Sequence, residues 1–117
     1  MSLIQEIPLG GAFFRKRVEA FLRSNSLRME AMDSYYAIMD ADENILAGAG
    51  ICDDVIKCVA VSEEARSQGL MLPLISHIVS LSSGRNLKVF TKPEYQAVFE
   101  SLGFRQIAAA PKAVLMA

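Results

Sequence analysis

The chain has 117 residues, of which 52% are apolar and 21% charged, with a formal net charge of −1. This length predicts one domain with a genuine core, and the near-neutral charge argues against nucleic-acid binding driven by bulk electrostatics. No apolar run reaches membrane-spanning length. One histidine and two cysteines without C-x-x-C spacing indicate no metal site. The start of the chain shows no secretory signal, so we expect a cytoplasmic protein that uses no metal and no membrane.

The first half of the chain predicts one helix followed by three strands. Residues 9–23 place a stripe of apolar side chains at helical spacing, formed by Phe14, Val18, Phe21 and Leu22. Residues 27–33 fit either a short helix or an irregular loop. From Tyr35 the apolar period changes to two, which predicts strands at 35–39, 45–51 and 55–61. The connections between them are too short for crossovers, so we expect an antiparallel meander.

The second half predicts a helix at 70–81, which Gly84 ends, and a strand at 87–91. Strand 55–61, this helix and strand 87–91 form a parallel βαβ unit. A further helix begins at Pro93 and runs to Leu102, and two closing strands follow at 105–109 and 113–116. The expected fold class is therefore α/β: a central twisted mixed sheet with helices on both faces. The chain has no linker or repeat, so residues 1–117 are expected to form a single domain.

The loop between strand 55–61 and the helix after it has the features of an anion site. Gly69 opens the helix, and the backbone N–H groups of a new helix N-terminus have no partners inside the helix. The helix dipole there favours negative charge, and a glycine lets a ligand approach the backbone closely. Many such units carry a glycine without binding an anion, so local chemistry alone leaves both interpretations open.

The same loop resembles the acetyl-CoA signature of the GNAT acyltransferases, which reads R/Q-x-x-G-x-G/A. The matching residues are Arg66, Ser67, Gln68, Gly69, Leu70 and Met71, which follow a strand ending in Val59, Ala60 and Val61. Met71 stands where the family usually has glycine or alanine. The resemblance implies that residues 66–71 bind the pyrophosphate of CoA. It also implies that the pantetheine arm runs along Val59, Ala60 and Val61.

Further segments of the sequence are similar to the citrate lyase ligases. Residues 99–104 resemble the GNAT ending Y-x-x-x-G-F, and residues 56–62, 90–95 and 111–116 resemble the N-terminal domain of these ligases. The resemblance implies a GNAT-like domain ahead of a nucleotidyltransferase domain, in an enzyme that acetylates a prosthetic-group thiol with acetate and ATP. It implies acetyl-CoA, or a CoA-like phosphopantetheine arm, as the ligand. The acyl-carrier subunit of citrate lyase is the implied partner.

The catalytic groups that the GNAT family uses are missing from their usual positions. Acetyl transfer to an amine needs a base and an acid. The resemblance implies that a Glu in the central strand is often the base and that a Tyr protonates the leaving thiolate. Lys57 and Phe99 stand at these two positions. Tyr95 is a candidate acid, although its spacing from Phe99 also fits a core residue. Cys58 is a candidate nucleophile, although strand alternation places Lys57 on the opposite face, where it cannot activate the thiol.

Two classes of function therefore stay open. The chain is either an acyl-CoA-dependent transferase domain, or a binding module that recognises the CoA-like arm of a carrier protein without catalysis. The vacant acid and base positions favour the binding module, and the Arg66-x-x-Gly69 loop is compatible with both.

Overall fold

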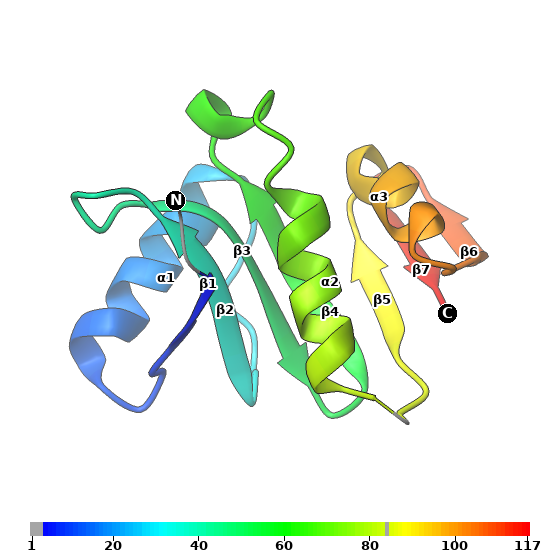
Figure 1. Ribbon diagram of the computed structural model, residues 1–117, viewed down its shortest axis with the longest axis horizontal. Coiled ribbons are helices and arrows are strands. Elements are labelled where there is room, and N and C mark those ends of the chain that lie inside the picture. The colour runs from blue at the N-terminus through cyan, green and yellow to red at the C-terminus, as the bar shows by residue number, and fades with distance from the viewer. Residues whose placement is uncertain (1–3, 84) are drawn as a thin grey trace.

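A computed structural model describes residues 4–83 and 85–117; Gly84, predicted to end a helix, lies outside them. In this part of the chain a seven-stranded mixed sheet carries helices on both faces (Figure 1). The strands are β1 (Ile4–Ile7), β2 (Ser34–Met39), β3 (Ile45–Cys52), β4 (Val55–Val61), β5 (Lys88–Thr91), β6 (Gln106–Ala110) and β7 (Ala113–Met116). The helices are α1 (Ala12–Ser24), α2 (Met71–Leu81) and α3 (Gln96–Ser101), with 3₁₀ turns η1 (Glu63–Ala65) and η2 (Pro93–Tyr95).

The strands follow the order β1-β2-β3-β4-β5-β7-β6 across the sheet. All neighbours are antiparallel except β4 and β5, which are parallel. This confirms the predicted meander, the central place of β4 and its parallel partner. The sequence did not predict β1, a four-residue strand that buries one side chain, Ile7, and pairs with β2 at the edge. A strand this short has too few alternations to show a period of two.

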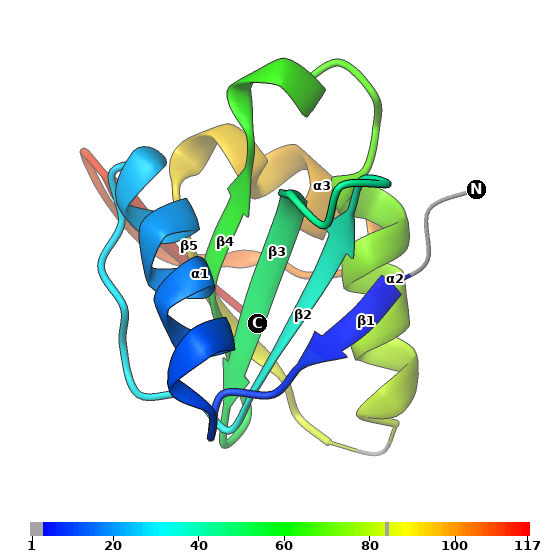
Figure 2. The same ribbon diagram turned by 90° about the vertical axis from the view of Figure 1, so that its left-hand side faces the viewer.

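Two apolar cores lie on opposite faces of the sheet, and Figure 2 shows α1 on one side with α2 on the other. On the α1 side, Val18, Phe21 and Leu22 pack against residues of β2 and β4 that include Cys58 and Ala60. Phe14 was predicted to join this stripe but is 38% exposed, since it lies in the first turn of α1. The larger core on the other side combines α2 and α3 with Val59, Val61 and Phe99, among others.

Close packing on the α1 side depends on a glycine in β3. Tyr35 of β2 is fully buried, and its hydroxyl donates a hydrogen bond to the Cys58 carbonyl at 3.4 Å. A Cβ added at Gly48 would lie 2.3 Å from the Tyr35 hydroxyl oxygen, closer than real Cβ atoms come to other groups. Gly48 is therefore required by the ring that lies across it, which is the close backbone approach that a strand glycine often marks.

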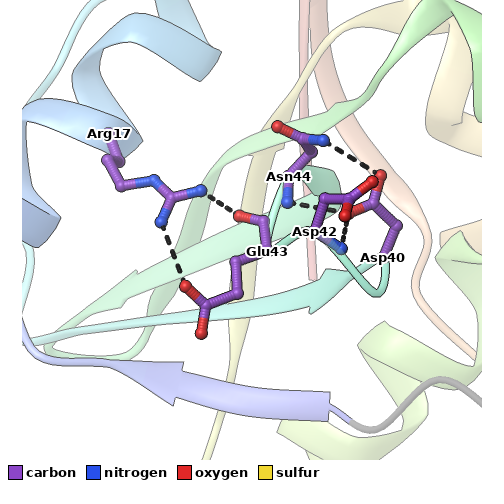
Figure 3. Close-up of polar contacts among 5 residues, drawn as sticks. All are labelled: Arg17, Asp40, Asp42, Glu43 and Asn44. Atoms are coloured by element: carbon purple, nitrogen blue, oxygen red, sulfur yellow. Dashed lines mark hydrogen bonds and ion pairs between the residues drawn. The ribbon is translucent and has the colours of Figure 1, made fainter.

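Helix α1 is fastened to the turn between β2 and β3 (Figure 3). The Asp40 carboxylate accepts hydrogen bonds from the backbone N–H groups of Asp42 and Asn44, both at 2.9 Å, and these bonds hold its pKa below the usual value. Glu43, which has a φ of +64°, binds Arg17 of α1 through its backbone carbonyl and its carboxylate. This contact connects α1 to the turn between β2 and β3. No helix in the described residues is long and apolar enough to cross a bilayer.

Candidate functional site

Strands β4 and β5 pair over only part of their length. Their parallel register covers Val55 with Lys88 and Ile56 with Val89, although β4 continues to Val61. Further along, the Val61 N–H group donates to the Tyr95 hydroxyl at 3.1 Å instead of to β5. The two strands therefore separate toward their carboxyl ends, and their backbones open a gap in the middle of the sheet.

A β-bulge lies at the point where this gap begins. Gly48 of β3 faces Ala60, but Gly50 faces Lys57, so Ala49 stands opposite the two residues Cys58 and Val59. Cys58 has a φ of +55°, which non-glycine residues rarely adopt. Bulges of this kind are common beside functional sites, because they redirect side chains and end the pairing of strands.

The loop before α2 presents a run of free backbone donors. Among the described residues, no acceptor is recorded for the N–H groups of Gly69, Leu70, Met71 and Leu72. Helix α2 has no side-chain cap at its start and no acidic residue in its first turn. Gly69 has a φ of +67°, and an added Cβ would meet nothing within 4 Å, so open space lies above it. These donors suit an anion.

A cavity of about 280 Å³ joins this loop to the gap between the strands. Five of the predicted binding residues line it: Val61, Arg66, Gly69, Leu70 and Met71. Ser67 and Gln68 are exposed in the same loop but do not line the cavity. Val59 and Ala60 are buried nearby in β4, Val59 toward α2 and Ala60 toward α1. The Met71 side chain is only 5% exposed and packs in the core.

Tyr95 lines the cavity, and its hydroxyl lies beside the N–H group of Val61, another lining residue. The side chain is 7% exposed, and burial raises the pKa of Tyr95 while the hydrogen bond from the Val61 N–H group lowers it. The phenol therefore keeps its proton at neutral pH. Its oxygen accepts from Val61, and no acceptor for its own proton is recorded among the described residues. The two roles weighed for Tyr95, core residue and proton donor, are compatible in this geometry.

Phe99 lies in the core and not in the gap. It is fully buried, and its ring packs edge-on against Phe104 with centroids 5.8 Å apart. A tyrosine at this position would place a hydroxyl among apolar side chains. The residue at the usual acid position of the family therefore does not face the cavity in this chain, and Tyr95, one turn earlier, does.

Lys57 and Cys58 share one face of the sheet, which corrects the prediction that strand alternation separates them. Both contact Glu30, Lys57 through its Nζ atom at 3.4 Å and Cys58 through its Sγ atom at 4.0 Å. The bulge is the cause, because the left-handed conformation of Cys58 breaks the alternation. Burial and the Glu30 carboxylate raise the pKa of Cys58 to about 11, so the thiol is a poor nucleophile at neutral pH.

Sequence reasoning missed several polar groups around the gap. The hydroxyls of Ser62 and Thr91, at the carboxyl ends of β4 and β5, are buried and have no hydrogen-bond partner among the residues that the structure describes. Unpaired buried hydroxyls are costly. Glu94 lines the cavity, and Glu30 reaches the bulge from the irregular segment after α1. Only their places in the fold distinguish these residues, since nothing in their local sequence does.

A larger cavity, of about 910 Å³, lies near the end of α2 and the start of β5. It is lined by residues such as Arg85, Lys88 and Phe104 and contains none of the predicted site residues. No group of three or more His, Cys, Asp or Glu side chains in residues 4–83 and 85–117 is arranged to hold a metal ion.

The fold is similar to those of solved acyltransferases. The ribosomal-protein-S18-alanine N-acetyltransferase from Escherichia coli matches with a TM-score of 0.74 at 15% identity, over 99% of this chain and 92% of that one. An acyl-CoA N-acyltransferase from Pseudomonas aeruginosa matches with a TM-score of 0.72 at 16% identity, over 99% and 98%. A GNAT-family acetyltransferase from Staphylococcus aureus Mu50 matches with a TM-score of 0.67 at 12% identity, over 97% and 98%. The chain therefore has a GNAT-like fold, as its sequence predicted.

The sequence itself is similar to part of a longer enzyme. Citrate (pro-3S)-lyase ligase from Escherichia coli K12 is 32% identical over 102 residues, which cover 85% of this chain and 29% of the relative. The ligase from Haemophilus influenzae is 35% identical over 104 residues, covering 85% and 31%. The chain thus spans about three tenths of the length of the curated relatives it matches. No family model matches the chain.

Proposed function

We propose that this domain binds acyl-CoA, with acetyl-CoA as the donor, across the gap between β4 and β5. The observation that carries the proposal is the run of free N–H groups at 69–72, in a loop that borders a cavity leading to this gap. The pyrophosphate would bind these donors together with Arg66, and the pantetheine arm would run along Val59, Ala60 and Val61.

The same geometry supports acyl transfer with Tyr95 as the proton donor. The nucleophile of the acceptor attacks the thioester carbonyl, the C–S bond breaks, and the leaving thiolate takes the proton of the Tyr95 hydroxyl. The Val61 N–H group stabilises the resulting phenolate, which recovers a proton from solvent or from the acceptor. Lys57 cannot act as the base, so an amine acceptor would react slowly, because a positioned base contributes about two to four orders of magnitude in rate.

The sequence relatives suggest to which longer enzyme this domain belongs. We propose that the domain belongs to a citrate lyase ligase, as the N-terminal domain, and that its natural acceptor is the prosthetic-group thiol on the acyl-carrier subunit of citrate lyase. A thiol needs less help from a base than an amine, since its pKa lies closer to neutrality. This agrees with the missing base. Such an enzyme would work in the cytoplasm, where acetyl-CoA is found.

A second candidate is a docking module that holds the CoA-like phosphopantetheine arm without catalysis. The positions of Lys57 and Phe99 favour it, since neither supplies the family's usual base or acid. The two candidates share the binding site and differ only in chemistry. Turnover of acetyl-CoA with a thiol acceptor separates them.

Calorimetric titration with CoA and acetyl-CoA tests the binding site. We expect binding by the natural sequence and its loss in Gly69→Glu, which places a side chain and a negative charge where the phosphates would lie. Gly10→Glu is the matched control, because Gly10 is an exposed turn glycine with nothing within 4 Å of an added Cβ. Absence of binding at millimolar CoA, or equal loss in both variants, would contradict the proposal.

A further inference from the structure

A cavity near the end of α1, which we call the second cavity, adjoins the 280 Å³ cavity of the candidate site. It has a volume of about 470 Å³ and is lined by Ser26, Leu27, Lys92, Pro93, Glu94 and Lys112. Glu94 lines both cavities, and the segment from Lys92 to Tyr95 contributes lining residues to each. In Figure 2 the end of α1, the turn η2 and the turn between β6 and β7 gather on the α1 side, away from the loop that precedes α2.

The second cavity carries an excess of positive charge. Lys92 donates one hydrogen bond to the Asn25 carbonyl, and an ammonium group has three donors, so two remain. Lys112 lies in the exposed turn between β6 and β7. Neither lysine has a carboxylate within 4.0 Å among the described residues. Among the described residues that line the cavity, Glu94 is the one acidic residue, which leaves two cations against one anion.

We propose that this second cavity receives the acyl acceptor, and that the acceptor carries a phosphate or similar anion which Lys92 and Lys112 bind. This rests on the proposed function, since it supplies the acceptor side of the same reaction. A cationic amine would meet two like charges here, whereas an anionic arm would form charge-assisted hydrogen bonds. The acceptor and the acyl donor would then approach the segment 92–95 from its two sides and meet beside Tyr95.

Lys112 is the residue on which the inference can be tested. Lys92 also has a structural role, because lysines near the end of a helix commonly bind its last carbonyl groups, as Lys92 does at Asn25. Replacing Lys92 would disturb the end of α1 as well as the cavity. Lys112 has no recorded hydrogen bond to a described residue through its side chain, so Lys112→Gln should leave the fold intact. Lys16→Gln is the matched control, since Lys16 is exposed on α1 and lines neither cavity.

The experiment compares two ligands that differ by one phosphate group. The full chain, saturated with CoA, is titrated with 4′-phosphopantetheine and with pantetheine, by calorimetry and by amide NMR shifts. We expect 4′-phosphopantetheine to bind about tenfold more tightly than pantetheine and to shift the amides of Leu27 and Lys112. Lys112→Gln should weaken its binding by about tenfold, and Lys16→Gln by less than about twofold.

The inference would be overturned by equal affinity for the two ligands or by an unchanged affinity for 4′-phosphopantetheine in Lys112→Gln. Amide NMR shifts confined to residues 69–72 would also overturn it. Its failure is distinct from failure of the proposed function. If CoA binds but 4′-phosphopantetheine and pantetheine bind equally well, only the proposal for the acceptor cavity is wrong. If CoA does not bind, the proposed donor site is wrong, and the same two titrations without CoA still decide whether Lys112 binds a phosphate.

Discussion

Cys58 is buried, has a strained backbone conformation and carries a thiol of low reactivity at neutral pH. Its left-handed conformation creates the bulge in β4, and the bulge turns its side chain toward the same face as Lys57. The thiol lies against the Arg28 carbonyl and the Glu30 carboxylate. A cation nearby usually favours a thiolate, but burial and the carboxylate outweigh Lys57 here. The conformation of Cys58 therefore shapes the strand, and its raised pKa argues against a role as nucleophile.

The first prediction concerns the reactivity of Cys58. With a pKa of about 11 against a usual value of 9.0, the thiolate fraction at pH 8 falls by about 100-fold. We expect alkylation of Cys58 by iodoacetamide to be slow at pH 8 and to accelerate steeply above pH 10. The measurement uses Cys52→Ser, which leaves Cys58 as the only thiol in the chain. Fast labelling at pH 7 would show that the thiol is activated.

The second prediction concerns stability at alkaline pH. Because folding raises the pKa of Cys58 above its value in the unfolded chain, the stabilisation linked to this proton is complete below about pH 9 and is lost as pH rises through about 11. Denaturant titrations of the natural chain and of Cys58→Ala should therefore converge as pH rises from 9 to 11. A difference between them that stays constant over this range would contradict the raised pKa.

The third prediction concerns the Tyr95 hydroxyl. In Tyr95→Phe the Val61 N–H group loses its acceptor, which should lower the free energy of unfolding by about 1 kcal/mol. CoA affinity should change little, since the hydroxyl is not among the groups proposed to bind the pyrophosphate. Acetyl transfer to a thiol acceptor should fall by about two orders of magnitude or more. If transfer is unchanged while stability falls, Tyr95 is a structural residue and another group supplies the proton.

At the scale of secondary-structure elements, the gap in the sheet depends on how β3, β4 and β5 are held. Strand β4 keeps its pairing with β3 through the bulge but leaves β5 after Ile56. On the α1 side, the ring of Tyr35 fills the space over Gly48 and supports the Cys58 carbonyl. The site is therefore built by backbone geometry in the middle of the sheet, with few reactive side chains.

The fourth prediction follows from this packing. A Cβ at position 48 would lie within 2.6 Å of three atoms of the Tyr35 side chain, so Gly48→Ala forces a buried ring to move. We expect a loss of about 2 kcal/mol or more in the free energy of unfolding, measured by urea titration. Gly10→Ala, with nothing within 4 Å of the new Cβ, should change it by less than about 1 kcal/mol. Tyr35→Ala should reduce the cost of Gly48→Ala in a double-mutant cycle, and additive effects would contradict this account.

For the whole molecule, the sequence predicts most of the architecture. Long apolar periods at 9–23, 55–61 and 70–81 gave the helices and the central strand, and the short connections gave the antiparallel meander. The sequence missed β1, whose four residues show no clear period, and it predicted one helix from Pro93 to Leu102 where a 3₁₀ turn precedes a shorter α3. Tertiary packing decides such short elements.

The part of the candidate site formed by the loop before α2 could be predicted from the sequence. The residues that only the tertiary fold brings to the site could not. Gly69 and Arg66 carry a local signal, because a strand, a loop and an uncapped helix follow one another in sequence. The shared face of Lys57 and Cys58 was missed, since a bulge has no signature when its residue is a cysteine. Glu30 and Thr91 come from segments distant in sequence, and only the fold brings them to the gap.

The central claim is that CoA binds across the gap between β4 and β5, with its pyrophosphate at the start of α2. Amide NMR spectra of the full chain titrated with CoA test this most directly. We expect the largest shifts at Gly69, Leu70 and Leu72, with a further shift at Val61, whose N–H group faces the gap, and little change in β1. No shift at these amides with millimolar CoA, or shifts confined to the distant cavity around Arg85 and Phe104, would contradict the account.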